Sequence, residues 1–174
     1  MTRVQSTPFP DSSRLAEIFP TGAWFQDSYV APLTRSDLSM PDLFFAIFAH
    51  HPDWLKALLM VRNRVAARFG LEVPSDADIR NPVQRADYRV GETIGPWPIF
   101  ALWPEELVAG RDNGHLNFRL SISRQMGPGG PTVTVSTVCH PHGLAGKAYL
   151  LAVAPFHKLG VTGLLADAAA HGRI

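Results

Sequence analysis

Between Pro98 and His140, apolar and polar residues alternate with a period of two, which places successive side chains on opposite faces of a strand. Four segments carry this pattern: 99–103, 106–112, 115–125 and 132–140. They are separated by Pro104, by the Asp-Asn-Gly turn at 112–114 and by the sequence GPGGP at 127–131. Because these links are short, we expect consecutive strands to pair antiparallel as a meander.

The longest of these segments, 115–125, divides its side chains cleanly between two faces. Leu116, Phe118, Leu120 and Ile122 share one face, and His115, Asn117, Arg119, Ser121 and Ser123 share the other. We therefore expect one face of the sheet to be covered and the other to be wet.

Residues 24–33 predict a first strand, and the residues after it follow the period of an α-helix. The first predicted helix begins at Ser39, with Pro41 in its first turn. The second begins at Pro52 and ends at Gly70. This arrangement predicts one strand and two helices ahead of the meander.

A long apolar segment, 144–170, predicts a C-terminal helix that contains Pro155. Proline removes a helical hydrogen bond, so we expect a kink there. Taking Phe156 as the centre of the inner face places Tyr149, Val153 and Gly160 near it. Lys147 and Lys158 then lie outside.

The order of these elements predicts an α+β fold in which a curved antiparallel sheet surrounds the kinked C-terminal helix. This is the order found in helix-grip, START-like proteins. Residues 1–23 predict an N-terminal arm, residues 24–174 a single domain, and residues 71–95 a long connection. A chain of 174 residues is long enough to bury one ordinary core.

Composition narrows the class of partner. A net charge of +1, with no run of lysine and arginine, argues against nucleic-acid binding. The single cysteine, Cys139, forms no disulfide within the chain, and no apolar run marks export or membrane insertion. We therefore expect a cytoplasmic protein with no membrane partner. The sequence is compatible with a homodimer.

Five stretches of the sequence resemble one bacterial family. They are GAWFQDSYVAPL, HHPDWLKALLMVRNRVAARFGL, IGPWPIF, DNGHLNFRLSI and TVCHPHGLAGKAYLLAVAPFHKLGV. Together, over roughly residues 23 to 166, they resemble the domain of unknown function 2867. The resemblance implies a START-like fold. It also implies that Arg62–Asn63, His115–Arg119 and Pro155–His157 belong to the family pattern, and it carries no settled activity.

Arg62 lies at the middle of an apolar helical stripe, flanked by Leu58, Leu59, Val65 and Ala66. An unpaired guanidinium there is costly because arginine stays charged. The Arg62 guanidinium must therefore pair with an internal carboxylate, bind a ligand oxygen, or reach solvent at the end of its extended aliphatic chain. Asp27 and Asp112 are the candidate carboxylates.

Three residues are the candidates for catalysis: Arg62 to hold a ligand oxygen, and His157 or Tyr149 to move a proton. A boundary histidine bonded to a carbonyl freed by Pro155, and a core tyrosine, are the alternatives. The expected ligand-binding residues are Trp54, Arg62, Asn63, Phe118, Arg119, Tyr149 and Phe156.

We expect no metal and no cofactor. His140 and His142 have a spacing able to grip a metal, but no carboxylate or cysteine at a matching local spacing completes the ligand set. The motifs of nucleotide binding, of serine hydrolases and of zinc proteases are missing from the sequence.

These features favour a protein that binds a small apolar or aromatic molecule between the sheet and the C-terminal helix. As an enzyme it would be a cofactor-independent cyclase, isomerase or dehydratase of secondary metabolism. The alternatives are a non-catalytic carrier or sensor, and an interaction module with a filled core.

Overall fold

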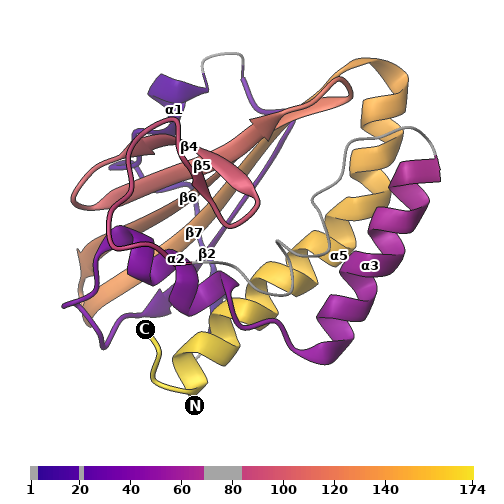
Figure 1. The fold of residues 1–174 in the computed structure, drawn as a ribbon. Coiled ribbons are helices and arrows are strands. Elements are labelled where there is room, and N and C mark those ends of the chain that lie inside the picture. Colours follow the sequence, from indigo (N-terminus) through magenta and orange to yellow (C-terminus); the bar gives the residue numbers. More distant parts are fainter. Residues whose placement is uncertain (1–3, 20–21, 69–83) are drawn as a thin grey trace.

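A seven-stranded antiparallel sheet forms the centre of the protein in the computed structural model, which describes residues 4–19, 22–68 and 84–174 (Figure 1). The strands are β1 Gln5–Ser6, β2 Phe25–Pro32, β3 Thr93–Ile94, β4 Trp97–Leu102, β5 Glu106–Asp112, β6 Leu116–Gly127 and β7 Gly130–Pro141. Their order in the sheet is β1-β2-β7-β6-β5-β4-β3. The predicted meander is confirmed as β4 to β7, and the predicted first strand is β2.

The helices are α1 Leu15–Ile18, α2 Met40–Phe48, α3 Asp53–Arg68 and α5 Gly143–Ala170. Ser39 is the N-cap of α2, as predicted, and its Oγ accepts a hydrogen bond from the Asp42 amide at 3.2 Å. Pro155 lies inside α5, which continues as one helix to Ala170. Residues 71–83, about half of the predicted connection 71–95, lie outside the described residues, and its remaining half contains β3.

The apolar core lies between one face of the sheet, which we call the inner face, and helices α2 and α5 (Figure 1). Leu107, Ile122 and Val135 project from neighbouring strands into this core and are fully buried. Leu43, Phe44 and Ile47 meet them from α2. A methyl group added at Gly160 of α5 would lie 3.6 Å from Leu55, so α3 packs directly beside α5.

The opposite, outer face of the sheet is also covered, so the expectation of a wet face is wrong. Leu15 and Phe19, from the N-terminal arm, pack on Val108 and Val138 of that face. Five hydroxyl-bearing residues of the outer face are almost completely buried: Ser28, Ser121, Ser123, Thr134 and Ser136. The arm lacks a clear hydrophobic period, which is why the layer it forms could not be predicted from the sequence.

Two charged side chains anchor this second layer. Glu106, 4% exposed, accepts hydrogen bonds from Ser13 Oγ at 2.6 Å, from the Arg14 amide at 2.8 Å and from Ser121 Oγ. Arg119, 6% exposed, pairs with Asp112 at 2.7 Å, and its guanidinium lies 3.5 Å from the centre of the Phe100 ring and 5.6 Å from the centre of the Phe19 ring in the arm. The outer face therefore uses its buried charges to hold the arm.

Helix α5 presents a different face to the sheet from the predicted one. Phe156, taken above as the centre of the inner face, is 51% exposed, so that assignment is wrong. The buried positions include Gly146, Leu150, Gly160 and Leu164, and their stripe is centred about 100° further round the helix. His157 lies on this stripe.

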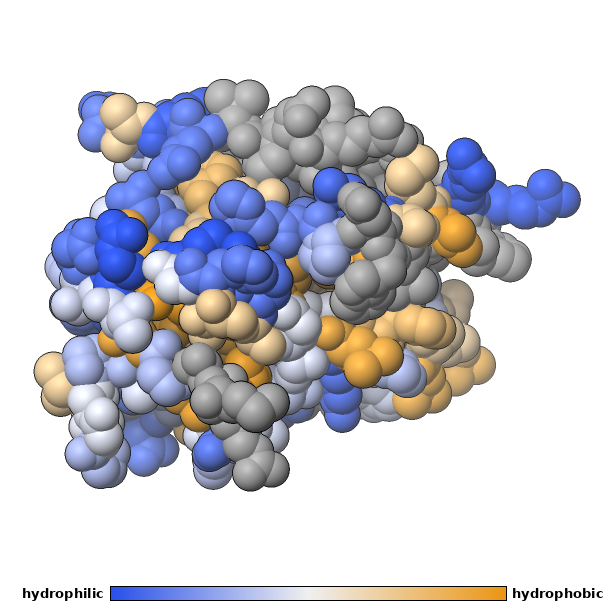
Figure 2. Space-filling model, turned by 90° about the horizontal axis from the view of Figure 1, so that it is seen from below, coloured by the Kyte–Doolittle hydropathy of each residue, from blue (hydrophilic) through white to orange (hydrophobic). Residues whose placement is uncertain are grey.

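The part of α5 between residues 144 and 159 carries an exposed apolar surface made by Leu144, Leu151, Phe156 and Leu159. Figure 2 shows apolar side chains gathered at the right of the molecule, the side on which Figure 1 places α3 and α5. Within the described residues, α5 is long and apolar enough to cross a membrane. A core helix of a soluble protein meets the same two criteria, and the second half of α5 packs in the core.

Candidate functional site

The inner face carries a buried carboxylate beside a histidine. Asp27 projects from β2, and His157 projects from the inner stripe of α5. His157 Nε2 lies 3.3 Å from Asp27 Oδ1. The Asp27 side chain is 8% exposed and the His157 side chain 24% exposed. The pair therefore has its carboxylate inside the protein and its imidazole at the edge.

Neighbouring side chains orient this pair. Tyr29, two residues along β2, donates its hydroxyl to Asp27 Oδ2 at 3.3 Å. The Phe25 ring meets the His157 imidazole edge-on, with the ring centres 5.9 Å apart. Within the described residues, His157 Nδ1 has no hydrogen-bond partner. If Nε2–H is directed at Asp27, Nδ1 is left as the basic nitrogen of the ring.

A hydroxyl and a thiol complete the surroundings of Asp27. Thr137 is its cross-strand partner on β7, and the Thr137 Oγ1 atom is buried with no hydrogen-bond partner among the described residues. Cys139 follows on the same face of β7. Burial, followed by the negative charge of Asp27, raises the pKa of the Cys139 thiol to about 12. The thiol therefore stays protonated and is no nucleophile at neutral pH.

Tyr29 is held in its neutral form in the same way. Burial is the main cause that raises the Tyr29 pKa to about 12, and the charge and hydrogen bond of Asp27 add to it. A neutral phenol keeps donating to Asp27 throughout the physiological range.

One row of inner-face residues crosses four strands beside this site. Arg111 of β5 is opposite Phe118 of β6, which is opposite Cys139 of β7, which is opposite Phe25 of β2. We call these four residues the inner row. Phe118 and Phe25 are partly exposed, and the Phe118 ring meets Trp97 edge-on with the centres 5.8 Å apart. The row offers aromatic surface next to the Asp27–His157 pair.

The structure brings together some of the residues predicted from sequence and separates others. Phe118 and His157 share the inner face, whereas Arg119 lies on the outer face, paired with Asp112. Tyr149 lies two turns before His157 on α5, where its ring contacts His115 with the centres 4.9 Å apart. The positions of Phe118 and His157 support a site on the inner face.

Three predicted residues cannot be placed in this site. Arg62, Asn63 and Trp54 belong to α3, but their side chains lie outside the described residues. Of the two carboxylates expected for Arg62, Asp27 contacts His157 and Asp112 contacts Arg119.

The histidines at the end of β7 lie close together but are engaged in other contacts. His140 Nδ1 is 3.2 Å from the Gly22 carbonyl, and His142 Nε2 is 3.0 Å from Asn117 Oδ1. Among the residues described here, no group of three histidine, cysteine or acidic side chains is placed to hold a metal ion.

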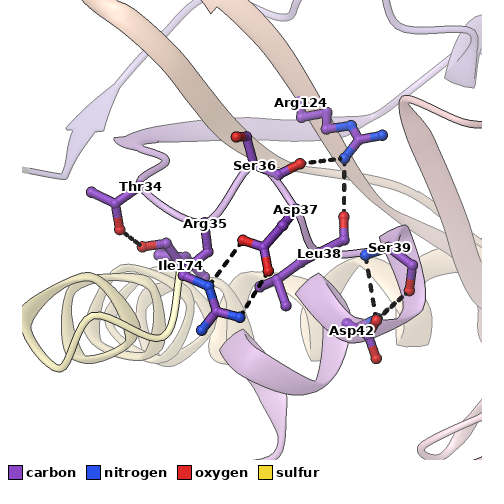
Figure 3. Close-up of polar contacts among 9 residues, drawn as sticks. All are labelled: Thr34, Arg35, Ser36, Asp37, Leu38, Ser39, Asp42, Arg124 and Ile174. Carbon is purple, nitrogen blue, oxygen red and sulfur yellow. Dashed lines mark hydrogen bonds and ion pairs between the residues drawn. The ribbon is translucent and has the colours of Figure 1, made fainter.

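A second surface feature is a groove of about 390 Å³ near the start of α2. It is lined by Ser39, Met40, Pro41, Leu102, Trp103, Pro104 and Arg124. Arg124 donates to Glu105 at 2.6 Å and to the carbonyls of Ser36 and Leu38 at 3.2 and 3.0 Å, the last two drawn in Figure 3. Because these contacts hold the connection between β2 and α2, we assign this arginine a structural role.

Three residues of the site were not predicted from the sequence. They are Thr137, Arg111, and Asp27 in its role as the partner of His157. Asp27 and His157 are 130 positions apart, and no local pattern joins them. One signal was available for Thr137, because alternation along β7 places it on the face opposite Thr134 and Ser136.

Comparison with known families identifies the chain. Residues 19–164 match the profile of the family described as protein of unknown function DUF2867, so the chain belongs to that family. No curated protein and no solved structure matches it. The function is therefore inferred from the geometry of the site.

Proposed function

We propose that this protein binds a small apolar or aromatic molecule at the inner row and transfers a proton of that molecule, as a cofactor-independent isomerase, cyclase or dehydratase. The Asp27–His157 pair carries the proposal, because a buried carboxylate oriented toward a partly exposed imidazole is the arrangement of a general base. The proposal includes a START-like, helix-grip fold and a cytoplasmic location.

The proposed mechanism gives each group one task. His157 Nδ1 takes a proton from the carbon next to a carbonyl group of the bound molecule, the electron pair of that C–H bond forms a carbon–carbon double bond, and the π electron pair of the carbonyl moves onto its oxygen. Asp27 stabilises the imidazolium that forms, through Nε2. The imidazolium then returns the proton to another carbon, or to a leaving hydroxyl group that departs as water.

Thr137 is the residue proposed to stabilise the negative charge that develops on the carbonyl oxygen. Its buried hydroxyl has no protein partner among the described residues, and it lies opposite Asp27 on the same face. In the proposal the side chains that enclose this hydroxyl move aside on binding, and it donates to the oxygen of the bound molecule, where a hydrogen bond strengthens as negative charge forms.

Proton exchange in heavy water tests the activity without knowledge of the natural substrate. A panel of aromatic and alicyclic ketones is incubated with the protein, and loss of the proton next to the carbonyl is followed by NMR. We expect His157→Gln to lower the exchange rate by about 100-fold or more. His171→Gln is the matched control, because His171 is exposed and pairs with Asp167 at the far end of α5.

Two results would contradict the catalytic proposal. Exchange that is unchanged in both His157→Gln and Asp27→Asn would place the chemistry elsewhere. Saturable binding of a panel compound with no exchange at all would leave a carrier or sensor as the function.

A further inference from the structure

Arg111 differs from the other buried and partly buried arginines whose side chains are described. Arg119, Arg124 and Arg173 each form an ion pair with a carboxylate, at 2.7, 2.6 and 2.5 Å. Arg111 is partly buried, and its Nη2 donates to the carbonyl of Pro96 at 2.7 Å. Among the described residues no carboxylate lies within ion-pair distance of it.

An arginine in this state keeps both its charge and most of its donors available. The guanidinium carries five N–H donors and does not deprotonate in proteins. A partly buried charge is normally retained with a partner, because desolvation without one is costly. A single backbone carbonyl neutralises none of the charge.

The position of Arg111 connects this charge to the proposed reaction site. It begins the inner row, and the row ends at Phe25, beside the His157 imidazole. Adjacent strands lie about 4.8 Å apart, so three spacings separate the two ends by about 14 Å. Between them lie Phe118 and Cys139, an aromatic ring and an uncharged thiol.

Resting on the function proposed above, we infer that the molecule bound here is an organic anion. Its carboxylate, or another anionic group with at least two oxygens, is bound by Arg111. Its flat apolar body lies along Phe118 and Cys139, and its reacting carbon lies at His157. The planar fork of arginine suits a carboxylate because it offers two parallel hydrogen bonds.

Two dyes that differ by one charged group test this inference. 8-Anilinonaphthalene-1-sulfonate carries a sulfonate, and N-phenyl-1-naphthylamine is the same molecule without it. We expect the wild-type protein to bind the anionic dye about tenfold more tightly than the neutral dye, as suits a hydrogen bond to a charged group. Added salt should lower the affinity for the anionic dye and leave the affinity for the neutral dye unchanged.

Substitution assigns the preference to one residue. Arg111→Gln should remove the preference for the anionic dye and keep the affinity for the neutral dye. Arg89→Gln, at an exposed arginine, is the matched control and should keep the preference. Arg111→Lys retains the charge without the fork and should retain part of the preference, which also guards against a folding defect of the glutamine variant.

The dye experiments distinguish failure of this inference from failure of the proposed function. Equal affinity for the two dyes in the wild type, or a preference that survives Arg111→Gln, overturns the anion site and leaves the proposed proton transfer standing. Failure of both dyes to bind saturably overturns the binding of an apolar molecule, and the anion site with it.

Discussion

The two faces of the sheet each bury one carboxylate, and they treat it differently. On the outer face, Glu106 accepts three hydrogen bonds from Ser13, Arg14 and Ser121. On the inner face, Asp27 has two contacts, both of 3.3 Å, with Tyr29 and His157. The outer carboxylate accepts three hydrogen bonds, all from groups that hold the fold. The inner one lies beside a thiol, a partly exposed imidazole and a hydroxyl that has no partner in the part of the chain the structure describes.

The same contrast separates two arginines. Arg119 on the outer face is paired with Asp112 and stacked on Phe100, while Arg111 on the inner face has one backbone carbonyl. Burial alone therefore does not mark a functional residue in this protein. The capacity for hydrogen bonds and charge pairing that the fold leaves unused is the better guide.

Glu106→Gln should give the largest loss of stability. The amide would turn a donor toward the groups that now donate to Glu106, so we expect the free energy of unfolding to fall by about 2 to 4 kcal/mol. Urea unfolding measures this loss. Glu17→Gln, at an exposed ion pair with Arg14, should change it by less than about 0.5 kcal/mol. A loss below about 1 kcal/mol for Glu106→Gln would show that the arm does not depend on this carboxylate.

Substitutions of Arg119 and Arg111 should give the next largest difference in stability. Arg119→Met removes an ion pair and a stacking contact, and we expect a loss of about 2 kcal/mol, moderated because Asp112 is half exposed. Arg111→Met removes an unpaired charge and should cost less than about 1 kcal/mol. Thermal and urea unfolding of both variants check the order. A larger loss for Arg111→Met would assign that residue to the fold.

Alkaline pH should destabilise the inner face. The pKa of Cys139 rises from 9.0 to about 12 on folding and that of Tyr29 from 10.0 to about 12. The unfolded chain therefore loses these protons first, so stability is fully present below about pH 9 and falls as pH rises toward 12. Unfolding measured across this range should show a shallower fall in Cys139→Ala. A fall of the same steepness in that variant would exclude the thiol as a cause.

Asp27→Asn should change stability at neutral pH far less than Glu106→Gln does. The asparagine still accepts from Tyr29, and the substitution removes a buried charge, so the free energy of unfolding should change by less than about 1 kcal/mol. The proposed proton exchange should nevertheless fall sharply. An unfolded Asp27→Asn protein would mean that Asp27 resembles Glu106 and serves the fold.

Sequence alone predicted most of the elements because strand alternation is local. The division of β6 into two faces was correct, since Phe118 and Arg119 do lie on opposite sides of the sheet. The rotation of α5 was not predictable in the same way. That helix is apolar nearly all the way round, with Leu151 and Leu159 exposed, so its periodicity gives no direction to the core.

The site was predictable only in part, for a related reason. His157 could be named because histidine is the usual proton carrier near neutral pH. Its partner could not, because contacts between β2 and α5 depend on the sheet order rather than on any local spacing. Arg111 drew no attention because an unpaired charge is visible only when every neighbouring carboxylate has been located.

The pairing of β2 with β7 has a consequence for how the chain folds during synthesis. Residues 25–32 pair with the two-residue strand β1 on one side and, along their whole length, with residues 132–139 on the other, and β7 also links β2 to the rest of the meander. On the ribosome, α2 and its buried side chains therefore emerge long before the sheet that covers them is complete. A nascent chain that stops short of β7 should remain unfolded and prone to aggregate, and exposure during this interval favours contact with chaperones.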